Sequence, residues 1–256
     1  MPLAVCGIDL SSNKFGLVLL DATDGDIIDW KYASPVQKNC AFFPKNSVKM
    51  PSRPSDTRMT PVFNMERMLK IITFYTDWFL QWQNYYSIIA NIEDYAYGVA
   101  RSGKGNTPAS RSLTGLAEIA GSVKLMMYNF DIPYRLTDPK SLKMWLGNGN
   151  YKKIDIYEVS KEKKTIMLDF LNDSAFFGVN KSKKKVFKEA LPGCDVMDAY
   201  WLADILRHEV LVRKGIYNLV SLEPTQRKLF LRVTTVNPVN ILDKPFVASS
   251  EKMRDI

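Results

Sequence analysis

The sequence contains few of the residues that build thiol and imidazole sites. Of its 256 residues one is a histidine, His208, and three are cysteines, Cys6, Cys40 and Cys194. Their scarcity, and the absence of CxxC spacing, exclude the usual Cys/His zinc sites. An odd number of cysteines without a recognisable secretory signal leads us to expect a protein of a reducing cytoplasm.

Long apolar runs and glycine-rich phosphate loops are also missing. No apolar stretch approaches the ~20 residues that a transmembrane helix needs, so we expect no contact with a membrane. Gly147-Asn-Gly149 has neither the GxGxxG pattern nor a GK[ST] ending, which leaves nucleotide binding with little support. The chain instead has a net charge of +8 and a pI near 9.2. This charge favours a nucleic acid partner, although a basic surface can also simply keep a protein in solution.

Hydrophobic periodicity predicts a mixed order of strands and helices. Strands are expected at 3–9, 15–21, 26–33 and 133–137, and in the apolar run that ends at Glu93. Helices are expected at about 64–82, 110–129, 140–146, 152–170 and 195–213. Asp138-Pro139 is a candidate cap for the third of these helices. The segment 34–63 reads as a long loop, and the tail has weak strand potential at 229–233. This order predicts an α/β fold with a mixed sheet flanked by helices.

Acidic residues occur at three places where burial is expected. Asp9 is near the end of the first apolar strand, Glu93 closes the run 88–92, and Asp195 with Asp198 opens an apolar helix. A carboxylate in such surroundings is destabilising unless something pairs with it. Asp195 and Asp198 share one helix face, and simple capping of the helix is an alternative explanation for them. Since capping explains neither strand carboxylate, we predict that all four converge.

A convergent acidic cluster needs cations or protons. Like charges ~4 Å apart repel by about 4 kcal/mol per pair at an effective dielectric near 20. Oxygen ligands without a nearby histidine favour Mg²⁺, with Mn²⁺ as a substitute. Two such ions ~3.5–4 Å apart can activate a water and stabilise the leaving oxygen in phosphodiester hydrolysis. Helix geometry places Asp204 and His208 on other faces, and Asp94 should point away from Glu93.

A basic segment with two tyrosines follows Glu93. From residue 98 to 117 it has no acidic residue. Its candidate DNA contacts are Tyr95, Tyr97, Arg101, Lys104 and Arg111. Phosphate contacts combined with base stacking on a tyrosine are a common nucleic-acid design, and an ordinary solvated loop is the alternative. Between residues 151 and 190, ten lysines face six acidic residues, a run that is either a second DNA surface or a solvated face.

With these features the chain resembles the RuvC family of Holliday-junction resolvases, particularly its phage-encoded members. The matching pieces are Gly7-Ile-Asp9-Leu-Ser-Ser, Ile92-Glu-Asp-Tyr-Ala-Tyr-Gly98, Leu116-Ala-Glu-Ile-Ala-Gly121, Asp138-Pro-Lys-Ser-Leu-Lys143, Gly147-Asn-Gly-Asn-Tyr-Lys-Lys153 and Asp195-Val-Met-Asp-Ala-Tyr-Trp-Leu-Ala203. Their order and spacing, over about residues 1–210, carry the resemblance. The chain departs from the family pattern at Ala96 and Tyr151.

The resemblance implies a ribonuclease H-like fold and a metal-dependent, structure-selective endonuclease that acts as a homodimer on branched DNA. It carries over the same four acids as catalytic and metal-binding residues. It also marks Lys143 and Lys153 as phosphate contacts, and we include the adjacent Lys152. We therefore expect a nuclease domain at 1–222 with an inserted loop at 34–63, followed by an extension at 223–256. A phage-encoded protein of this kind would act in the cytoplasm of a bacterial host.

Other functions fit parts of this pattern. A nuclease of this type could act on forks, flaps or RNA–DNA hybrids. A protein of the same fold could bind DNA without cutting it, but it would gain nothing from a repulsive acidic cluster. An actin-like ATPase also begins with a strand, an aspartate and a Ser/Thr turn. It would need a further glycine-rich phosphate turn that the sequence lacks, and it would have no use for Glu93.

Overall fold

Six strands, five α-helices and one short 3₁₀ helix make up the described part of the chain, which the computed structural model gives as residues 1–10, 14–35, 45–52, 60–94, 108–146, 194–237 and 242–250. The strands are β1 (Leu3–Leu10), β2 (Phe15–Asp21), β3 (Ile27–Ser34), β4 (Ser47–Lys49), β5 (Ser87–Glu93) and β6 (Tyr134–Thr137). The helical elements are α2 (Thr60–Gln83), α3 (Pro108–Asn129), α4 (Pro139–Leu146), α7 (Cys194–Arg213), η3 (Leu219–Ser221) and α8 (Pro224–Thr234). None of these helices combines the length and the apolar character that crossing a bilayer requires.

The six strands form one mixed sheet in the order β4-β3-β2-β1-β5-β6. β2 is antiparallel to both β1 and β3, whereas β5 is parallel to β1 and β6 is parallel to β5. β1, β2 and β3 thus form an antiparallel unit, and the sheet continues into the parallel strands β5 and β6. The mixed α/β fold expected from the sequence is therefore confirmed.

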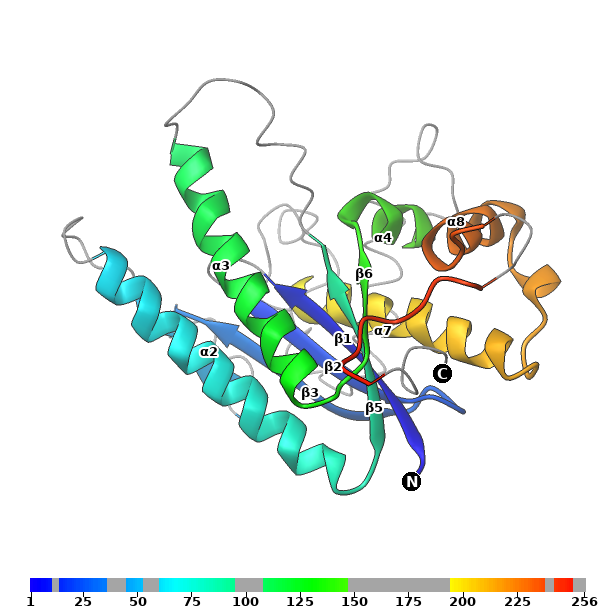
Figure 1. Ribbon diagram of the computed structural model, residues 1–256, viewed down its shortest axis with the longest axis horizontal. Coiled ribbons are helices and arrows are strands. Elements are labelled where there is room, and N and C mark those ends of the chain that lie inside the picture. Colours follow the sequence, from blue (N-terminus) through cyan, green and yellow to red (C-terminus); the bar gives the residue numbers. More distant parts are fainter. Residues whose placement is uncertain are drawn as a thin grey trace, which may run out of the picture.

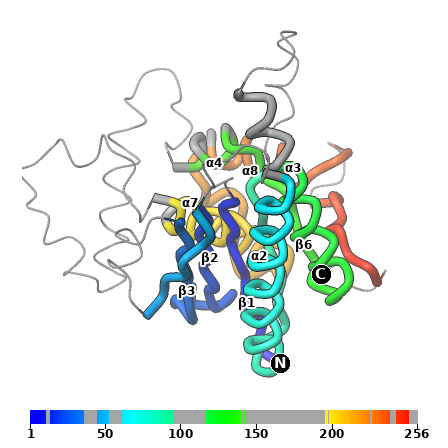
Figure 2. The backbone as a smooth tube through the Cα atoms, turned by 90° about the vertical axis from the view of Figure 1, so that its left-hand side faces the viewer, coloured from blue at the N-terminus to red at the C-terminus, as the bar shows by residue number. Residues whose placement is uncertain are grey.

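Helices cover both faces of this sheet (Figure 1). On one face, α2 and α3 pack over the even-numbered side chains of β1, such as Cys6 and Ile8. On the other face, α7 packs over odd-numbered side chains such as Val5. α4 and α8 share a smaller core with α7, at the end of the molecule opposite the N-terminus (Figure 2). α7 thus packs on the sheet with one set of side chains and on two short helices with another.

Two segments differ from their sequence-based assignments. The expected loop at 34–63 contributes strand β4 beside β3, and α2 begins at Thr60. The weak strand expected at 229–233 is wrong, because these residues belong to helix α8. Pro224 in the first turn starts this helix, and Leu229, Phe230 and Val233 are its buried side chains. Their spacing at i, i+1 and i+4 matches a helix that buries one face, and tertiary packing on α4 and α7 overrides the β-propensity of the run.

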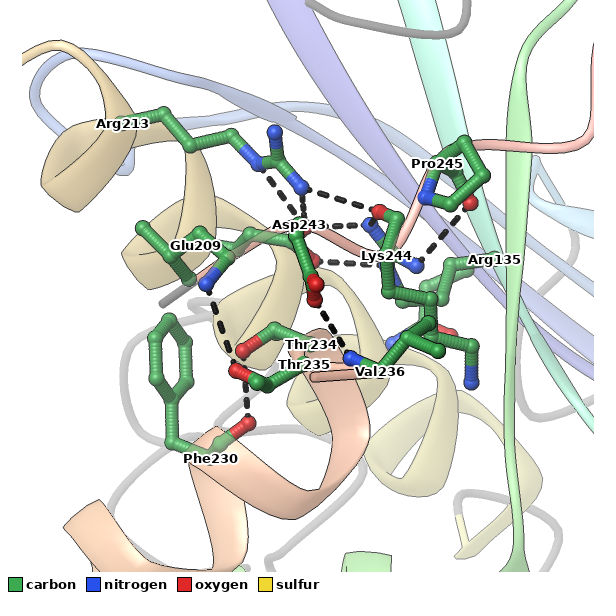
Figure 3. Close-up of polar contacts among 12 residues, drawn as sticks. Arg135, Glu209, Arg213, Phe230, Thr234, Thr235, Val236, Asp243, Lys244 and Pro245 are labelled. Carbon is green, nitrogen blue, oxygen red and sulfur yellow. Dashed lines mark hydrogen bonds and ion pairs between the residues drawn. The ribbon is translucent and has the colours of Figure 1, made fainter. Parts of the chain in front are cut away.

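The last described segment, 242–250, meets the β6 edge of the sheet at one bridge and is tied to α7 by a buried ion-pair network (Figure 3). Val247 pairs with Tyr134 of β6 through two backbone hydrogen bonds of 2.9 and 3.0 Å. The Glu209 carboxylate accepts from the guanidinium groups of Arg135 and Arg213. Both guanidiniums also donate to the carbonyl of Lys244, each at 3.0 Å. This isolated bridge pairs the first residue of an edge strand.

Candidate active site

Asp9 and Glu93 are brought together by the pairing of β1 with β5. The parallel register aligns Ile8 with Ile92, so the next residue of each strand, Asp9 and Glu93, lies side by side. Successive side chains of a strand alternate between faces, which turns both carboxyl groups toward α7. Asp9 retains 5% of its exposure, and Glu93 is partly buried. The end of this parallel pair therefore carries two adjacent acidic groups.

The first turn of α7 lies directly on β1 and β2 because two glycines leave room for its backbone. A Cβ at Gly16 would lie 2.2 Å from the carbonyl oxygen of Asp195, and one at Gly7 would lie 1.7 Å from that of Ala199. Gly16 is the register partner of Asp9 on β2. Any larger residue at either position would lift the helix from the sheet. This close approach brings Asp195 and Asp198 over the strand carboxylates.

The three other carboxyl groups act electrostatically on Asp9. The pKa of Asp9 is raised well above its ordinary value, first by burial and then by the charge of Glu93 and a hydrogen bond with its side chain. The charges of Asp198 and Asp195 raise it further. Each of these causes disfavours an ionised Asp9. Glu93, Asp195 and Asp198 therefore lie near enough to act on Asp9, and without a cation the cluster favours a proton on Asp9.

The donor chemistry of this cluster fits a hard divalent cation. Four carboxyl groups supply oxygen ligands only, which is the set that Mg²⁺ and Mn²⁺ prefer. In the described residues, no three or more Asp, Glu, His or Cys side chains are arranged as the ligands of an ion.

Asn91 is the centre of a buried hydrogen-bond network next to the cluster, which was not predicted from the sequence. The amide of Asn91, a fully buried residue, donates to the Leu202 carbonyl of α7 at 2.9 Å. The Thr137 hydroxyl of β6 donates to Asn91 Oδ1, also at 2.9 Å. These bonds link β5, β6 and α7 at a position two residues before Glu93. An asparagine two residues before Glu93, and therefore on the same face of an apolar strand, was the signal available in the sequence.

Three acidic or basic residues near the cluster have partners elsewhere, as strand and helix geometry predicted. Asp94 pairs with Lys124 of α3, with 3.2 Å between the carboxylate and the ammonium. Asp204 accepts from the Trp145 indole at 3.1 Å and lies 3.4 Å from the imidazole of His208. The His208 ring packs edge-on against Trp145 and Tyr217. Asp204 and His208 thus belong to the packing between α7 and α4, whereas Asp94 is paired with α3.

Only two of the expected DNA contacts lie in the part of the chain that the structure describes. Arg111 lies in the first turn of α3, and Lys143 lies in α4. The remaining expected contacts are outside the described residues: Tyr95, Tyr97, Arg101, Lys104, Lys152 and Lys153. The lysine-rich helix expected at 152–170 and the turn at 147–149 are outside them as well.

Comparison with known proteins gives a structural similarity and no sequence match. No family model and no curated protein matches the chain. Among solved structures, a Thermus thermophilus RuvC in complex with a Holliday junction substrate covers 84% of this chain and 97% of its own, with a TM-score of 0.45 and 13% identity. A second Thermus thermophilus RuvC structure covers 84% and 98%, with a TM-score of 0.44 and 13% identity. Similarity at this level assigns neither an activity nor an active-site residue.

Proposed function

We propose that this protein is a divalent-metal-dependent endonuclease that hydrolyses phosphodiester bonds in branched DNA, with the four-way Holliday junction as its first candidate substrate. The observation that carries the proposal is the convergence of four carboxyl groups, from β1, β5 and α7, on the buried Asp9. The net charge of +8 supports a polyanionic substrate. In this proposal residues 1–222 form the nuclease domain of a RuvC-like, phage-encoded resolvase, and 223–256 form an extension.

The proposed metal ligands are Asp9, Glu93, Asp195 and Asp198, which would hold two Mg²⁺ or Mn²⁺ ions. When bound, such ions supply an activated water and stabilise charge on the leaving oxygen. The protein's own part is to place the four carboxylates around one point and to keep bulk water from Asp9. A protein that only bound DNA would carry the repulsion within this cluster without benefit, which is why we favour cleavage over binding alone.

The proposed DNA contacts are the basic and aromatic residues selected from the sequence. They are Tyr95, Tyr97, Arg101, Lys104, Arg111, Lys143, Lys152 and Lys153. Arg111 is in the first turn of α3, the helix after β5, and Lys143 is in α4, the helix after β6. Both helices follow the carboxyl ends of these strands, the end of the sheet that also carries Glu93. Forks, flaps and RNA–DNA hybrids are the alternative substrates, because they present the same phosphates with a different branch.

Two symmetric cuts in a four-way junction would require a homodimer with two-fold symmetry. Exposed apolar side chains on α2 and α3 could form the contact between the two subunits. On α2, Met65 and Leu69 are 61% and 68% exposed, and on α3 Leu125 is 61% exposed. Light scattering on the free protein and on its junction complex would detect the dimer, and a monomer in both would contradict it.

Cleavage assays test the proposal directly. Labelled four-way junction, fork and linear duplex are incubated with the protein in Mg²⁺ or in EDTA, and products are resolved on denaturing gels. We expect junction cleavage with Mg²⁺ and none in EDTA. Asp9→Asn, Glu93→Gln, Asp195→Asn and Asp198→Asn should each abolish cleavage while DNA binding is kept or becomes tighter. Wild-type rates in any two of these variants would show that the cluster is not the active site.

A further inference from the structure

We infer that Arg232 of α8 is a phosphate-contacting residue that the C-terminal extension adds to the substrate surface beside the acidic cluster. This inference rests on the proposed function, and it assigns a role to a helix that the sequence analysis could not place. Its basis is the position of α8 against the first turn of α4, together with the exposure and anchoring of one guanidinium group.

The position follows from the pairing of β5 with β6. Glu93 and Thr137 are register partners, and the amide of Asp94 donates to the Thr137 carbonyl at 2.9 Å. The next residue, Asp138, caps α4, since its carboxylate accepts from the amide of Ser141 at 2.9 Å. The first turn of α4 therefore begins directly beside the strand end that carries Glu93.

Arg232 is anchored on this turn. Its guanidinium donates to the Ser141 hydroxyl at 2.6 Å and lies 3.9 Å from the Asp138 carboxylate. Ser141 is fully buried, and its hydroxyl in turn donates to Asp138. An interstrand spacing, one Cα step, the length of the Asp138 side chain and the 3.9 Å contact to its carboxylate together place the guanidinium within roughly 16 Å of the Glu93 Cα, about five base pairs at ~3.4 Å rise.

The Arg232 guanidinium is anchored by its protein contacts while much of its side chain stays exposed to solvent. The Arg232 side chain is 54% exposed and that of Asp138 is 45% exposed. An exposed ion pair at this distance contributes little to stability, on the order of 0–1 kcal/mol. Arginine has five N–H donors in a planar fork that matches phosphate oxygens, so the exposed donors can bind a phosphate while Ser141 fixes the orientation.

The rest of α8 has the charge expected of a phosphate-facing helix. Its eleven residues include Arg227, Lys228 and Arg232 and no acidic residue. Lys228 is exposed and lies one turn before Arg232, on the same helix face. The opposite face, with Leu229 and Phe230, is buried against α4 and α7. Packing therefore fixes the direction in which the basic face points.

The test compares DNA binding by four variants across a salt series. A labelled four-way junction is titrated in EDTA, without cleavage, using fluorescence anisotropy with the wild type, Arg232→Ala, Arg232→Gln and Arg232→Lys. Lys214→Ala is the matched control, because this exposed lysine follows the far end of α7, about 28 Å from Asp195 by helix rise. The thermal midpoint of each variant is measured in parallel.

We expect Arg232→Ala and Arg232→Gln to reduce the slope of log K against log salt by about 0.9, which corresponds to roughly eightfold weaker binding near 0.1 M salt. Arg232→Lys, which keeps the charge, and Lys214→Ala should keep the wild-type slope. Equal slopes in all variants would overturn the inference. So would a lower thermal midpoint in Arg232→Ala with unchanged slopes in the Gln and Lys variants, since Arg232 would then only tether α8 to α4.

The failure of this inference differs from the failure of the proposed function. Unchanged slopes together with Mg²⁺-dependent junction cleavage would refute the role of Arg232 and leave the nuclease standing. A reduced slope in a protein that never cleaves would refute the nuclease and support Arg232 as a DNA contact. A wild type that binds no DNA would overturn both.

Discussion

Replacing Gly16 by alanine tests whether the close contact between α7 and β2 sets the geometry of the acidic cluster. The added Cβ would lie 2.2 Å from the carbonyl oxygen of Asp195 and 2.6 Å from the amide nitrogen of Val196. Real Cβ contacts below 3.0 Å essentially never occur, so the first turn of α7 must retreat by at least 0.8 Å, the difference between 3.0 and 2.2 Å. Both atoms belong to the helix backbone, and no change of rotamer can relieve the clash.

This retreat would carry Asp195 and Asp198 away from Asp9 and Glu93. Catalytic groups generally need to be held within ~0.5 Å of their productive positions, and a misplacement of ~1 Å can reduce a rate by about 10²-fold. We therefore expect Mg²⁺-dependent cleavage to become on the order of a hundredfold slower. Overpacking at a buried position should also lower the free energy of unfolding by about 1–3 kcal/mol.

The assay is single-turnover cleavage of a labelled four-way junction in Mg²⁺, with the fold checked by circular dichroism and thermal melting. Gly121→Ala is the matched control, because an added Cβ on α3 would have no atom within 4 Å. The control should cleave at the wild-type rate and be up to about 1 kcal/mol more stable, as alanine is the better helix former. Cleavage by Gly16→Ala within threefold of the wild type would refute the idea that this contact positions the cluster.

Three further predictions concern stability. Because the folded-state pKa of Asp9 is raised, stability in EDTA should fall as pH rises above the unfolded value near 4, and Asp9→Asn should flatten this trend in thermal melts; an unchanged trend would contradict the coupling. Glu209→Ala leaves the buried guanidinium of Arg135 without its carboxylate and should lower the free energy of unfolding by about 3–5 kcal/mol in urea titrations, whereas a wild-type midpoint would argue against the network. Burial lowers the pKa of His208, but the bonds and charge of Asp204 outweigh it and leave the pKa raised, so its contribution should be present below pH ~6.5 and be lost as pH rises through the higher folded value. His208→Gln should remove this loss of stability at higher pH, measured by thermal melting across pH. Identical pH profiles of the variant and the wild type would contradict a stabilising role for protonated His208.

Much of the fold follows from local patterns. β1 and β2 are almost entirely buried, so their apolar runs identify them as strands without reference to any partner. The N-cap of α4 was also predictable, since Asp138 is followed by proline. The Ser141 amide donates to the Asp138 carboxylate, which confirms the cap. The failures occur where packing outweighs propensity. Residues 229–233 contain β-forming side chains, yet they are helical because Leu229 and Phe230 complete the core between α4 and α7.

The sequence by itself determined which carboxylates belong together. Asp9 and Glu93 close apolar strands and Asp195 with Asp198 opens an apolar helix, so burial and spacing select the four without a three-dimensional structure. Their role as metal ligands remains a prediction.

The tertiary structure alone decided how the four acids meet and what surrounds them. Gly7 and Gly16 look like ordinary strand glycines, and their function appears only when α7 lies on them, because the distance between a helix and a sheet depends on both partners. Arg232 is likewise an ordinary surface arginine in the sequence. It lies on the first turn of α4 because a chain segment about 140 residues after Glu93 folds back onto the helix that follows β6, and no local pattern encodes such a long-range contact.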